Sequence, residues 1–546
     1  MFAGLGRFIV RRKKSVLILF IIGILAAGGV GSLAFSKLDS GGYSDLNSDS
    51  AKAYEYLTDK FKVQEPAAIL VIDTGDRSVN DPDVIAEAAA LEAQVKSVAQ
   101  VDRTLSYWTT GGAPSMKAAD DKAAFLFIFS DPDSNDWAAL EKIGREVQAK
   151  FDGKQGNFTV YASGAGVITH AINNKIKEDL FLAEAIAIPL TFILLIFVFG
   201  AMVASAMPLV VGVSAILGSF LIIYILTLFT DVSVFALNLI TGLGLGLGID
   251  YALLIVNRFR EELHAGKSVD ESVVTTVATA GKTVFYSGLT VFVTMASLLL
   301  FPLNFLKSFG YAGVAVISLA VLGALIPLPA LLAILGHKID KGVIRKAGIV
   351  PSEDGRWART ARTVMKRPVP VVIGSLLILG VLAAPITNIA FAQVDARVLP
   401  KSDPAAVAST VIDDRFTGLE GSPIEVVIPD GKGKEIEINN FLARVQGVYG
   451  ISRVGQIEYF GNDVRVQVIS SEQSRTLDAQ RIIHDIRDLP VPEGTLIGGA
   501  AADFTDSQDG IARALPWALG WIALTVFILI FVFTGSIILP TFPAGI

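Results

Sequence analysis

The chain has 546 residues, of which 52% are hydrophobic and only 18% are charged. Soluble globular chains are about 25% charged, so this composition indicates a membrane protein. The net charge of −6 says little, because the charges are segregated by region. The chain contains no cysteine, which excludes a disulfide framework and a thiolate metal site, and its scattered histidines show no metal-ligand spacing.

Long apolar runs predict eight transmembrane helices, because each run is long enough to cross a hydrocarbon core about 30 Å thick. The first run follows a basic start, as a signal peptide would. Its apolar core is long, however, and Ser32–Phe35 is a poor cleavage site, so we expect an anchor that stays. In chain order the runs are Ser15–Phe35, Phe181–Val203, Pro208–Phe229, Val232–Val256, Val284–Pro302, Phe309–Leu335, Val369–Ile389 and Leu515–Phe533.

Two long polar segments, Ser36–Leu180 and Ala390–Ala514, each predict the order strand, helix, strand, strand, helix, strand. Alternating β-branched and aromatic residues favour the strands, and runs rich in Ala, Glu, Lys and Gln favour the helices. Two βαβ units in tandem are typical of a ferredoxin-like, split βαβ domain. The predicted helices are Pro82–Val98, Trp137–Phe151, Glu435–Val448 and Thr476–Leu489, and the strands are Ala67–Thr74, Val101–Trp108, Ala123–Ser130, Phe158–Ala162, Pro423–Pro429, Ile451–Tyr459, Val464–Ser470 and Thr495–Ile497.

The pattern of a helix, a large polar domain and a helix therefore occurs twice, which indicates an internal repeat. After Phe199 the first copy continues through four more helices, whereas the chain stops at Ile546 soon after Phe533. We therefore expect a chain truncated after its eighth helix, with a natural short form as the alternative. Local matches support the repeat: Asp49–Phe61 parallels Ser402–Phe416, Phe197–Ala201 parallels Phe531–Gly535, and Met207–Leu209 parallels Leu539–Thr541.

Lysine and arginine gather in three regions: the N-terminus, Asn257–Thr283 and Gly336–Pro368. With eight crossings all three fall on one side, which the positive-inside rule makes cytoplasmic. The predicted organisation is an N-terminus and first helix (1–35), a first extracytoplasmic porter domain (36–180), a five-helix membrane domain (181–335) with a cytoplasmic loop (257–283), a basic loop (336–368), a seventh helix (369–389), a second porter domain (390–514) and an eighth helix with the chain end (515–546).

Asp250 lies within an apolar stretch, Leu237–Val256, and the next charge is Arg258, eight residues on. At about 1.5 Å per helical residue the carboxylate sits roughly 12 Å inside the boundary. An aspartate at that depth costs about 2.5–3.5 kcal/mol on insertion scales, and such residues often carry protons or ions. The alternative is a helix–helix hydrogen bond without a transport role.

Glycines at i,i+4 spacing precede Asp250 and let helix backbones approach closely: Gly242 pairs with Gly246, and Gly244 with Gly248. A phosphate-binding loop is disfavoured, because no Lys-Ser/Thr ends the run. Tyr251 does not share a helix face with Asp250, since neighbouring residues point apart, so we expect its partner on another helix.

The segment Gly242–Glu262 resembles the fourth-helix motif of the MMPL (MmpL) family of the resistance–nodulation–division (RND) superfamily. Phe301–Ser308 and Met1–Arg7 are similar to the family too, and the resemblance covers essentially the whole chain. It implies that Asp250 and Tyr251 relay protons opposite a matching Asp-Tyr pair on a tenth helix. This chain has no counterpart of that second pair.

The resemblance also implies a function: a multi-pass exporter in the cell membrane, driven by protons, that moves lipids or other hydrophobic compounds. Such a protein is not an enzyme, and protons are its coupling ion, with no other cofactor and no metal. Its expected partners are membrane lipids or a hydrophobic substrate, a second copy or accessory membrane proteins, and no nucleic acid. The alternatives are a non-transporting membrane scaffold or lipid-binding module, and a proton-driven helper of protein secretion.

Overall fold

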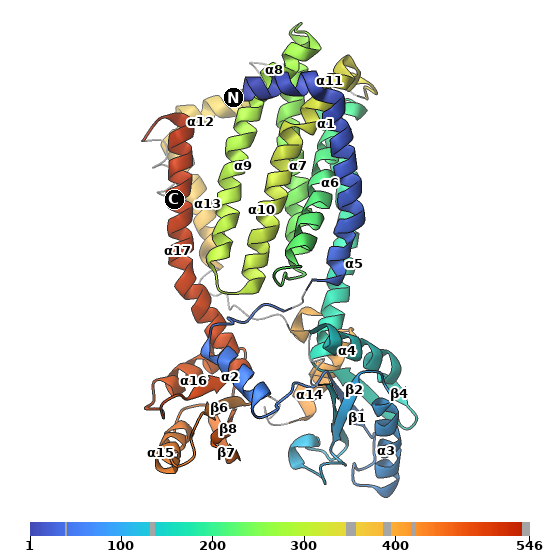
Figure 1. Cartoon of the computed structure of the whole chain (residues 1–546), viewed down its shortest axis with the longest axis vertical. Helices are drawn as coiled ribbons and strands as arrows, with labels where there is room; N and C mark the ends of the chain where they lie inside the picture. Colours follow the sequence, from blue (N-terminus) through green and yellow to red (C-terminus); the bar gives the residue numbers. More distant parts are fainter. Residues whose placement is uncertain (39–40, 132–136, 345–355, 386–394, 417–421, 538–546) are drawn as a thin grey trace.

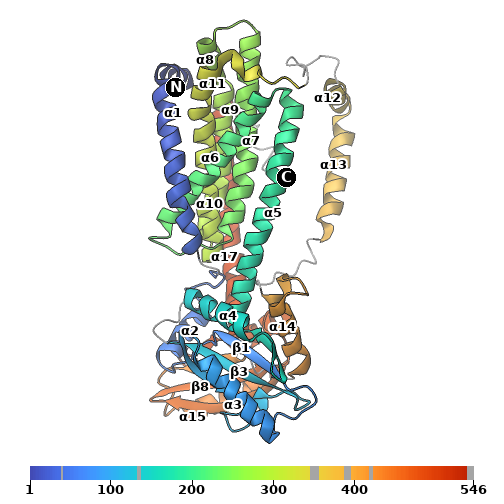
Figure 2. The same ribbon diagram turned by 90° about the vertical axis from the view of Figure 1, so that its right-hand side faces the viewer.

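The computed structural model describes residues 1–38, 41–131, 137–344, 356–385, 395–416 and 422–537. Long helices form one half of the molecule (Figure 1 and Figure 2), and two small α/β domains lie side by side below them (Figure 1). The fold class is therefore as predicted: a polytopic helical protein with two α+β domains.

Seven helical segments of the described chain are long and apolar enough to cross a membrane, and a bent pair of helices makes a potential eighth. The bent pair is α12 (Arg356–Lys366) and α13 (Pro368–Ala383), which meet at 99°. The other spans are α1 (Phe2–Gly31), α5 (Ala165–Phe199), α6 (Met202–Leu226), α7 (Ala236–His264), α8 (Val269–Ala278) with α9 (Ala280–Ala296), α10 (Asn304–Leu325) with α11 (Pro327–Leu335), and α17 (Ala500–Thr534).

Two of these helices extend far beyond their apolar runs. Both α5 and α17 contain 35 residues, about 50 Å at the usual helical rise, and their first turns lie inside the α/β domains. A glycine with positive φ precedes each helix: Gly164 (φ 99°) and Gly499 (φ 91°). A Cβ would meet backbone atoms at 2.9 Å and 2.3 Å respectively, so both positions favour glycine for its positive φ and for the lack of space.

The first domain has a five-stranded antiparallel sheet in the order β2-β3-β1-β5-β4. Its central strand β1 pairs on both sides, with Ala68 opposite Ile128 of β3 and Leu70 opposite Ala162 of β5. The elements are β1 (Ala68–Asp73), α3 (Pro82–Lys96), β2 (Val101–Ser106), β3 (Ala123–Ser130), α4 (Trp137–Phe151), β4 (Gly153–Gln155) and β5 (Phe158–Ser163).

The second domain repeats this topology with the sheet order β7-β8-β6-β9. The equivalent strands of the first domain run β2-β3-β1-β5, so the predicted split βαβ plan holds in both copies, and only the short edge strand β4 is extra. The elements are β6 (Ile424–Ile428), α15 (Glu435–Gln446), β7 (Ile451–Phe460), β8 (Asp463–Ser470), α16 (Leu477–Arg487) and β9 (Leu496–Gly498).

The two domains exchange a helix. Helix α2 (Asp49–Asp59) leads into the first domain but packs on β9 of the second. The contact is close: a Cβ added to Gly498 of β9 would lie only 2.8 Å from the Ala53 methyl carbon of α2. Helix α14 (Pro404–Arg415) leads into the second domain but packs on β5 of the first. The exchanged helices are the segments that the repeat aligns.

Candidate functional site

Helix α7 carries the predicted relay residues and packs against α6 and α10 in the centre of the bundle. The structure divides the predicted residues between two faces of α7. Gly244, Gly248 and Tyr251 are buried against neighbouring helices, whereas Gly242, Gly246 and Asp250 are exposed. The i,i+4 glycine pairs therefore have different surroundings.

On the inner face, the absence of side chains lets backbones meet. A Cβ on Gly248 would lie 2.6 Å from the Gly212 Cα of α6, and one on Gly244 would lie 2.5 Å from Ile216 Cγ1. Both distances are below 3.0 Å, so a side chain at Gly248 would push the α6 backbone away and one at Gly244 would displace the Ile216 side chain.

Tyr251 points from the inner face toward α9 and is only 3% exposed. A Cβ added to Gly288 of α9 would lie 3.6 Å from the Tyr251 hydroxyl oxygen. The side chain of the neighbouring Ser287 is close enough to interact with this hydroxyl. Among the described residues, the hydroxyl makes no hydrogen bond of ordinary geometry. The hydroxyl is therefore a buried polar group that can still donate and accept hydrogen bonds.

On the outer face, Asp250 and two glycines one and two turns before it form an open stripe. A Cβ on Gly242 or Gly246 would meet no atom of the described residues within 4 Å. Asp250 itself is exposed, near the middle of an apolar helix. A carboxylate facing hydrocarbon there costs several kcal/mol, so this face requires either a polar partner or water. The structure brings Tyr251 and Asp250 into one helical turn but not into contact with a shared partner.

A second acidic side chain in the membrane half was missed at the sequence level. Glu184 lies on α5 within the predicted second span and interacts with Thr241 of α7. Thr241 lies nine residues before Asp250, which places it on the opposite face of the helix. The signal was present in the sequence, since Glu184 is the one acidic residue of Phe181–Val203.

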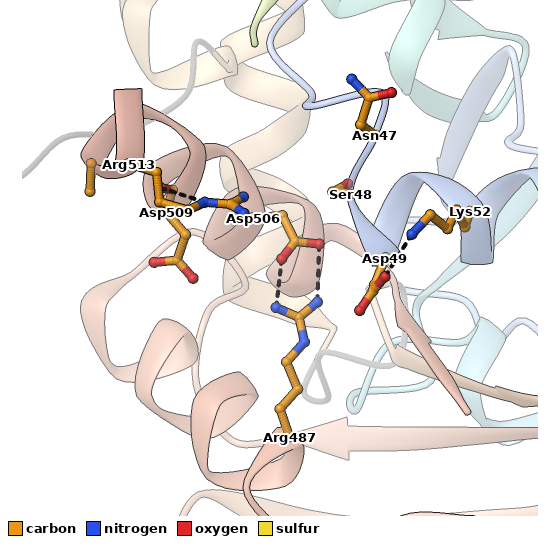
Figure 3. Close-up of a pocket in the computed structure, with 9 residues that line it drawn as sticks. Asn47, Ser48, Asp49, Lys52, Arg487, Asp506, Asp509 and Arg513 are labelled. Atoms are coloured by element: carbon orange, nitrogen blue, oxygen red, sulfur yellow. Dashed lines mark hydrogen bonds and ion pairs between the residues drawn. The ribbon is translucent and has the colours of Figure 1, made fainter. Parts of the chain in front are cut away.

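A polar joint connects the second α/β domain to the membrane half (Figure 3). Asp506, on the part of α17 below the apolar run, accepts two hydrogen bonds from Arg487 of α16, with Arg487 Nη2 3.0 Å from Oδ2. Asp506 Oδ2 also accepts the backbone N–H of Ser50 on α2, at 3.0 Å. One carboxylate thus holds three segments together, and we call Ser50, Arg487 and Asp506 the polar joint.

A cavity of about 700 Å³ opens beside the polar joint. It is lined by equal numbers of acidic and basic side chains, and Lys52 lies beside Asp49 and Arg487 beside Asp506 (Figure 3). No single charge dominates, so the lining favours neither a cation nor an anion. The lining residues are Asn47, Ser48, Asp49, Lys52, Arg487, Asp506, Asp509, Ala512 and Arg513.

The first α/β domain has an equivalent attachment. Glu141 of α4 accepts a hydrogen bond from Asn173 of α5 at 2.9 Å and lies 3.3 Å from His170 Nδ1. Helices α4 and α16 occupy the same position in the repeat, as do α5 and α17. In each half, therefore, the second helix of the domain is tied by polar side chains to the helix that enters the membrane.

Comparison with known proteins agrees with this architecture. The chain is 33% identical to a membrane protein of Streptomyces coelicolor, over 99% of this chain and 74% of that protein. It is 28% identical to the trehalose monomycolate exporter MmpL3 of Mycobacterium tuberculosis and 27% identical to the mycolic acid-containing lipids exporter MmpL11 of Mycolicibacterium smegmatis. These matches cover 99% and 92% of this chain but only 62% and 54% of those exporters.

A solved structure and a family model complete the comparison. The hedgehog release protein Disp of the water bear Hypsibius dujardini superimposes with a TM-score of 0.59 at 11% identity, over 99% of this chain and 84% of that one, which shows a shared fold. The model of the MMPL family matches residues 43–371, which include both the first α/β domain and α7. The chain belongs to the MMPL family.

Proposed function

We propose that the protein takes part in proton-driven export of lipids or other hydrophobic compounds across the cell membrane, with Asp250 as the proton-carrying group. The observation that carries this proposal is the exposed carboxylate on the open face of α7, a helix whose opposite face packs closely at Gly244 and Gly248. The relatives named above as lipid exporters support the substrate class. The proposed activity moves a substrate without converting it.

The charged and the protonated form of Asp250 differ in the free energy of placing the side chain against apolar surface. The charged form is unfavourable against apolar surface, whereas the neutral form is tolerated, so gain or loss of a proton changes what can cover this face of α7. Tyr251 sits one residue on and connects the same turn to α9. A change in how α7 packs would reach the α/β domains through α6 and α5, because α6 follows α5 directly and α5 continues into the first domain.

Export can be tested in liposomes that contain this chain and a fluorescently labelled phospholipid, with a pH gradient across the bilayer. The proposal predicts that the gradient speeds movement of the label between leaflets, measured by dithionite quenching. Asp250→Asn keeps the shape but cannot exchange a proton and should abolish the gradient effect, whereas Tyr251→Phe should weaken it. Equal rates with and without a gradient for the unaltered chain contradict the proposal.

We further propose that the α/β domains lie outside the cell and the ends of α7 and α8 inside. The basic residues of Asn257–Thr283 support this orientation. Single cysteines can report it, because the chain has none of its own. In intact cells Ala86→Cys, exposed on α3, should react with an impermeant reagent, and Ala265→Cys, exposed after α7, should react only after permeabilisation. The reverse pattern contradicts the orientation.

A further inference from the structure

The short helix α12 lies across the direction of the membrane spans. It meets α13 at 99°, and α13 contains no charged residue. In Figure 1, α12 lies at the end of the molecule farthest from the α/β domains, at the level of α8 and the start of α1. If α13 crosses the bilayer, α12 must therefore run along the surface of that bilayer rather than through it.

The sequence of α12 separates two kinds of side chain. At 100° per residue, Ala358, Ala361 and Met365 fall on one arc of the helix, and Val364 lies at its edge. Arg359, Arg362 and Lys366 fall on the neighbouring arc, centred about 100° away from the apolar one. All seven are exposed or half-exposed, including Val364 at 40% and Met365 at 78%. From Arg356 to Arg367 the sequence contains no acidic residue.

The positive-inside rule explains only part of this pattern. That rule accounts for basic residues near the ends of transmembrane helices. It does not account for their gathering on one arc of α12, or for the bend of about a right angle between α12 and α13. A helix with an apolar arc and a basic arc, lying parallel to a membrane, is the arrangement of an interfacial helix. The neighbouring span adds a second observation: none of the residues of α13 is buried, so packing against the bundle does little to hold this pair in place.

We propose that α12 binds the anionic phospholipid of the adjacent leaflet. The arc of Ala361 and Met365 would enter the boundary between headgroups and acyl chains, and Arg359, Arg362 and Lys366 would contact lipid phosphates. This contact anchors the α12–α13 pair at a fixed depth. The partner is a lipid surface because the apolar arc needs hydrocarbon, which a free phosphate does not offer.

The proposal can be tested on the full chain in nanodiscs made from phosphatidylcholine, with or without phosphatidylglycerol. Met365→Cys gives a single labelling site for a fluorophore whose emission shifts to the blue in an apolar environment. Phosphatidylglycerol should shift the emission to the blue, inorganic phosphate should not, and added salt should reverse the shift because surface charges are screened. Identical spectra in both lipids overturn the proposal.

Charge variants sharpen the test. Arg359→Gln/Arg362→Gln/Lys366→Gln should raise the phosphatidylglycerol content needed for half of the shift by roughly tenfold or more, given the usual contribution of each basic residue at an anionic surface. The control Lys142→Gln/Arg145→Gln/Lys150→Gln removes the same charge from exposed positions on α4 and should leave the response unchanged. Arg359→Gln alone should give an intermediate response, which excludes misfolding of the triple variant. Equal loss in the control overturns the proposal.

Discussion

Arg415 Nη1 lies 2.6 Å from Asp73 Oδ2, although 342 residues separate them in the chain. The guanidinium also contacts Asp120 at 3.0 Å, and the next residue, Phe416, stacks on Phe125 with ring centroids 3.8 Å apart. These contacts fix the end of α14 to the first α/β domain. Together with α2 on the second domain, they hold the two domains side by side, so the exchange is stabilised by specific polar pairs as well as by apolar burial.

The first prediction removes this ion pair. Arg415→Gln should destabilise the joined domains by about 1–3 kcal/mol, because it leaves Asp73 partly buried without its charged partner. The midpoint of thermal unfolding in detergent should fall by several degrees, since about 1 kcal/mol shifts it by about 2–4 °C for a folded unit of roughly 150–250 residues. Arg481→Gln is the matched control, because Arg481 is exposed and pairs with the exposed Asp478 in its own helix. Equal midpoints for the two variants would contradict the role given to Arg415.

The second prediction concerns pH. Partial burial raises the pKa of Asp120, but the backbone N–H of Lys122 and the Arg415 guanidinium lower it more, so its pKa lies below the ordinary value of 3.8. A carboxylate with a lowered pKa stabilises the fold above its unfolded pKa, and this contribution is lost as pH falls through the folded value. Asp120 is half-exposed, so solvent screening keeps the effect below about 1 kcal/mol.

Asp120→Asn should therefore lower the thermal midpoint slightly at pH 6, and the difference from the unaltered chain should shrink as the pH falls below the unfolded pKa of about 3.9. Unfolding midpoints measured across this range test the sign. A difference that grows on acidification would show that the carboxylate is not stabilised by Arg415.

Much of the fold could be predicted because hydropathy and side-chain periodicity are local signals. The apolar runs identify the spans, and the order of strands and helices in Ser36–Leu180 predicts a split βαβ domain that the sheet order confirms. The exchange of α2 and α14 could not be predicted in this way. Aligning Asp49–Phe61 with Ser402–Phe416 shows that the helices are equivalent, but the choice of domain depends on contacts between segments hundreds of residues apart.

The sequence could single out the residues of the candidate site, but it could not tell which of them face a neighbouring helix. Asp250 stands out because a charge deep in an apolar helix is costly. The four glycines look alike in sequence, yet only Gly244 and Gly248 face a neighbouring helix. Arg260 is a similar case: it lies in a basic segment, but it is buried and donates to Asp340 at 2.8 Å and to the Phe199 carbonyl at 3.1 Å. Which face of a helix is covered depends on packing that no local pattern specifies.

The third prediction tests the polar joint. Asp506→Ala removes the acceptor for both the Ser50 N–H and the Arg487 guanidinium, so the start of α2 and the end of α16 should open more readily. Hydrogen exchange should become faster in peptides that cover these two places, and not in the strands of the first domain. Asp509→Ala is the control, because Asp509 pairs with the half-exposed His484. Faster exchange of α2 in the Asp509 variant, and not in the Asp506 variant, would contradict the joint.

The last prediction separates packing from function within one helix. Gly248→Leu should destabilise the protein by several kcal/mol, because the new side chain must displace the Gly212 backbone, 2.6 Å from its Cβ. Gly246→Leu adds the same side chain two residues earlier, where no atom of the described chain lies within 4 Å of a Cβ, and replaces a glycine that weakens the helix by about 0.5–1 kcal/mol relative to alanine. The thermal midpoint of the Gly246 variant should therefore stay the same or rise. If the open face around Asp250 is where protons and a partner surface meet, Gly246→Leu should still reduce gradient-driven lipid movement in liposomes. Loss of stability in both variants would show that the outer face is packed, and unchanged transport by the Gly246 variant would separate this face from the export that we propose.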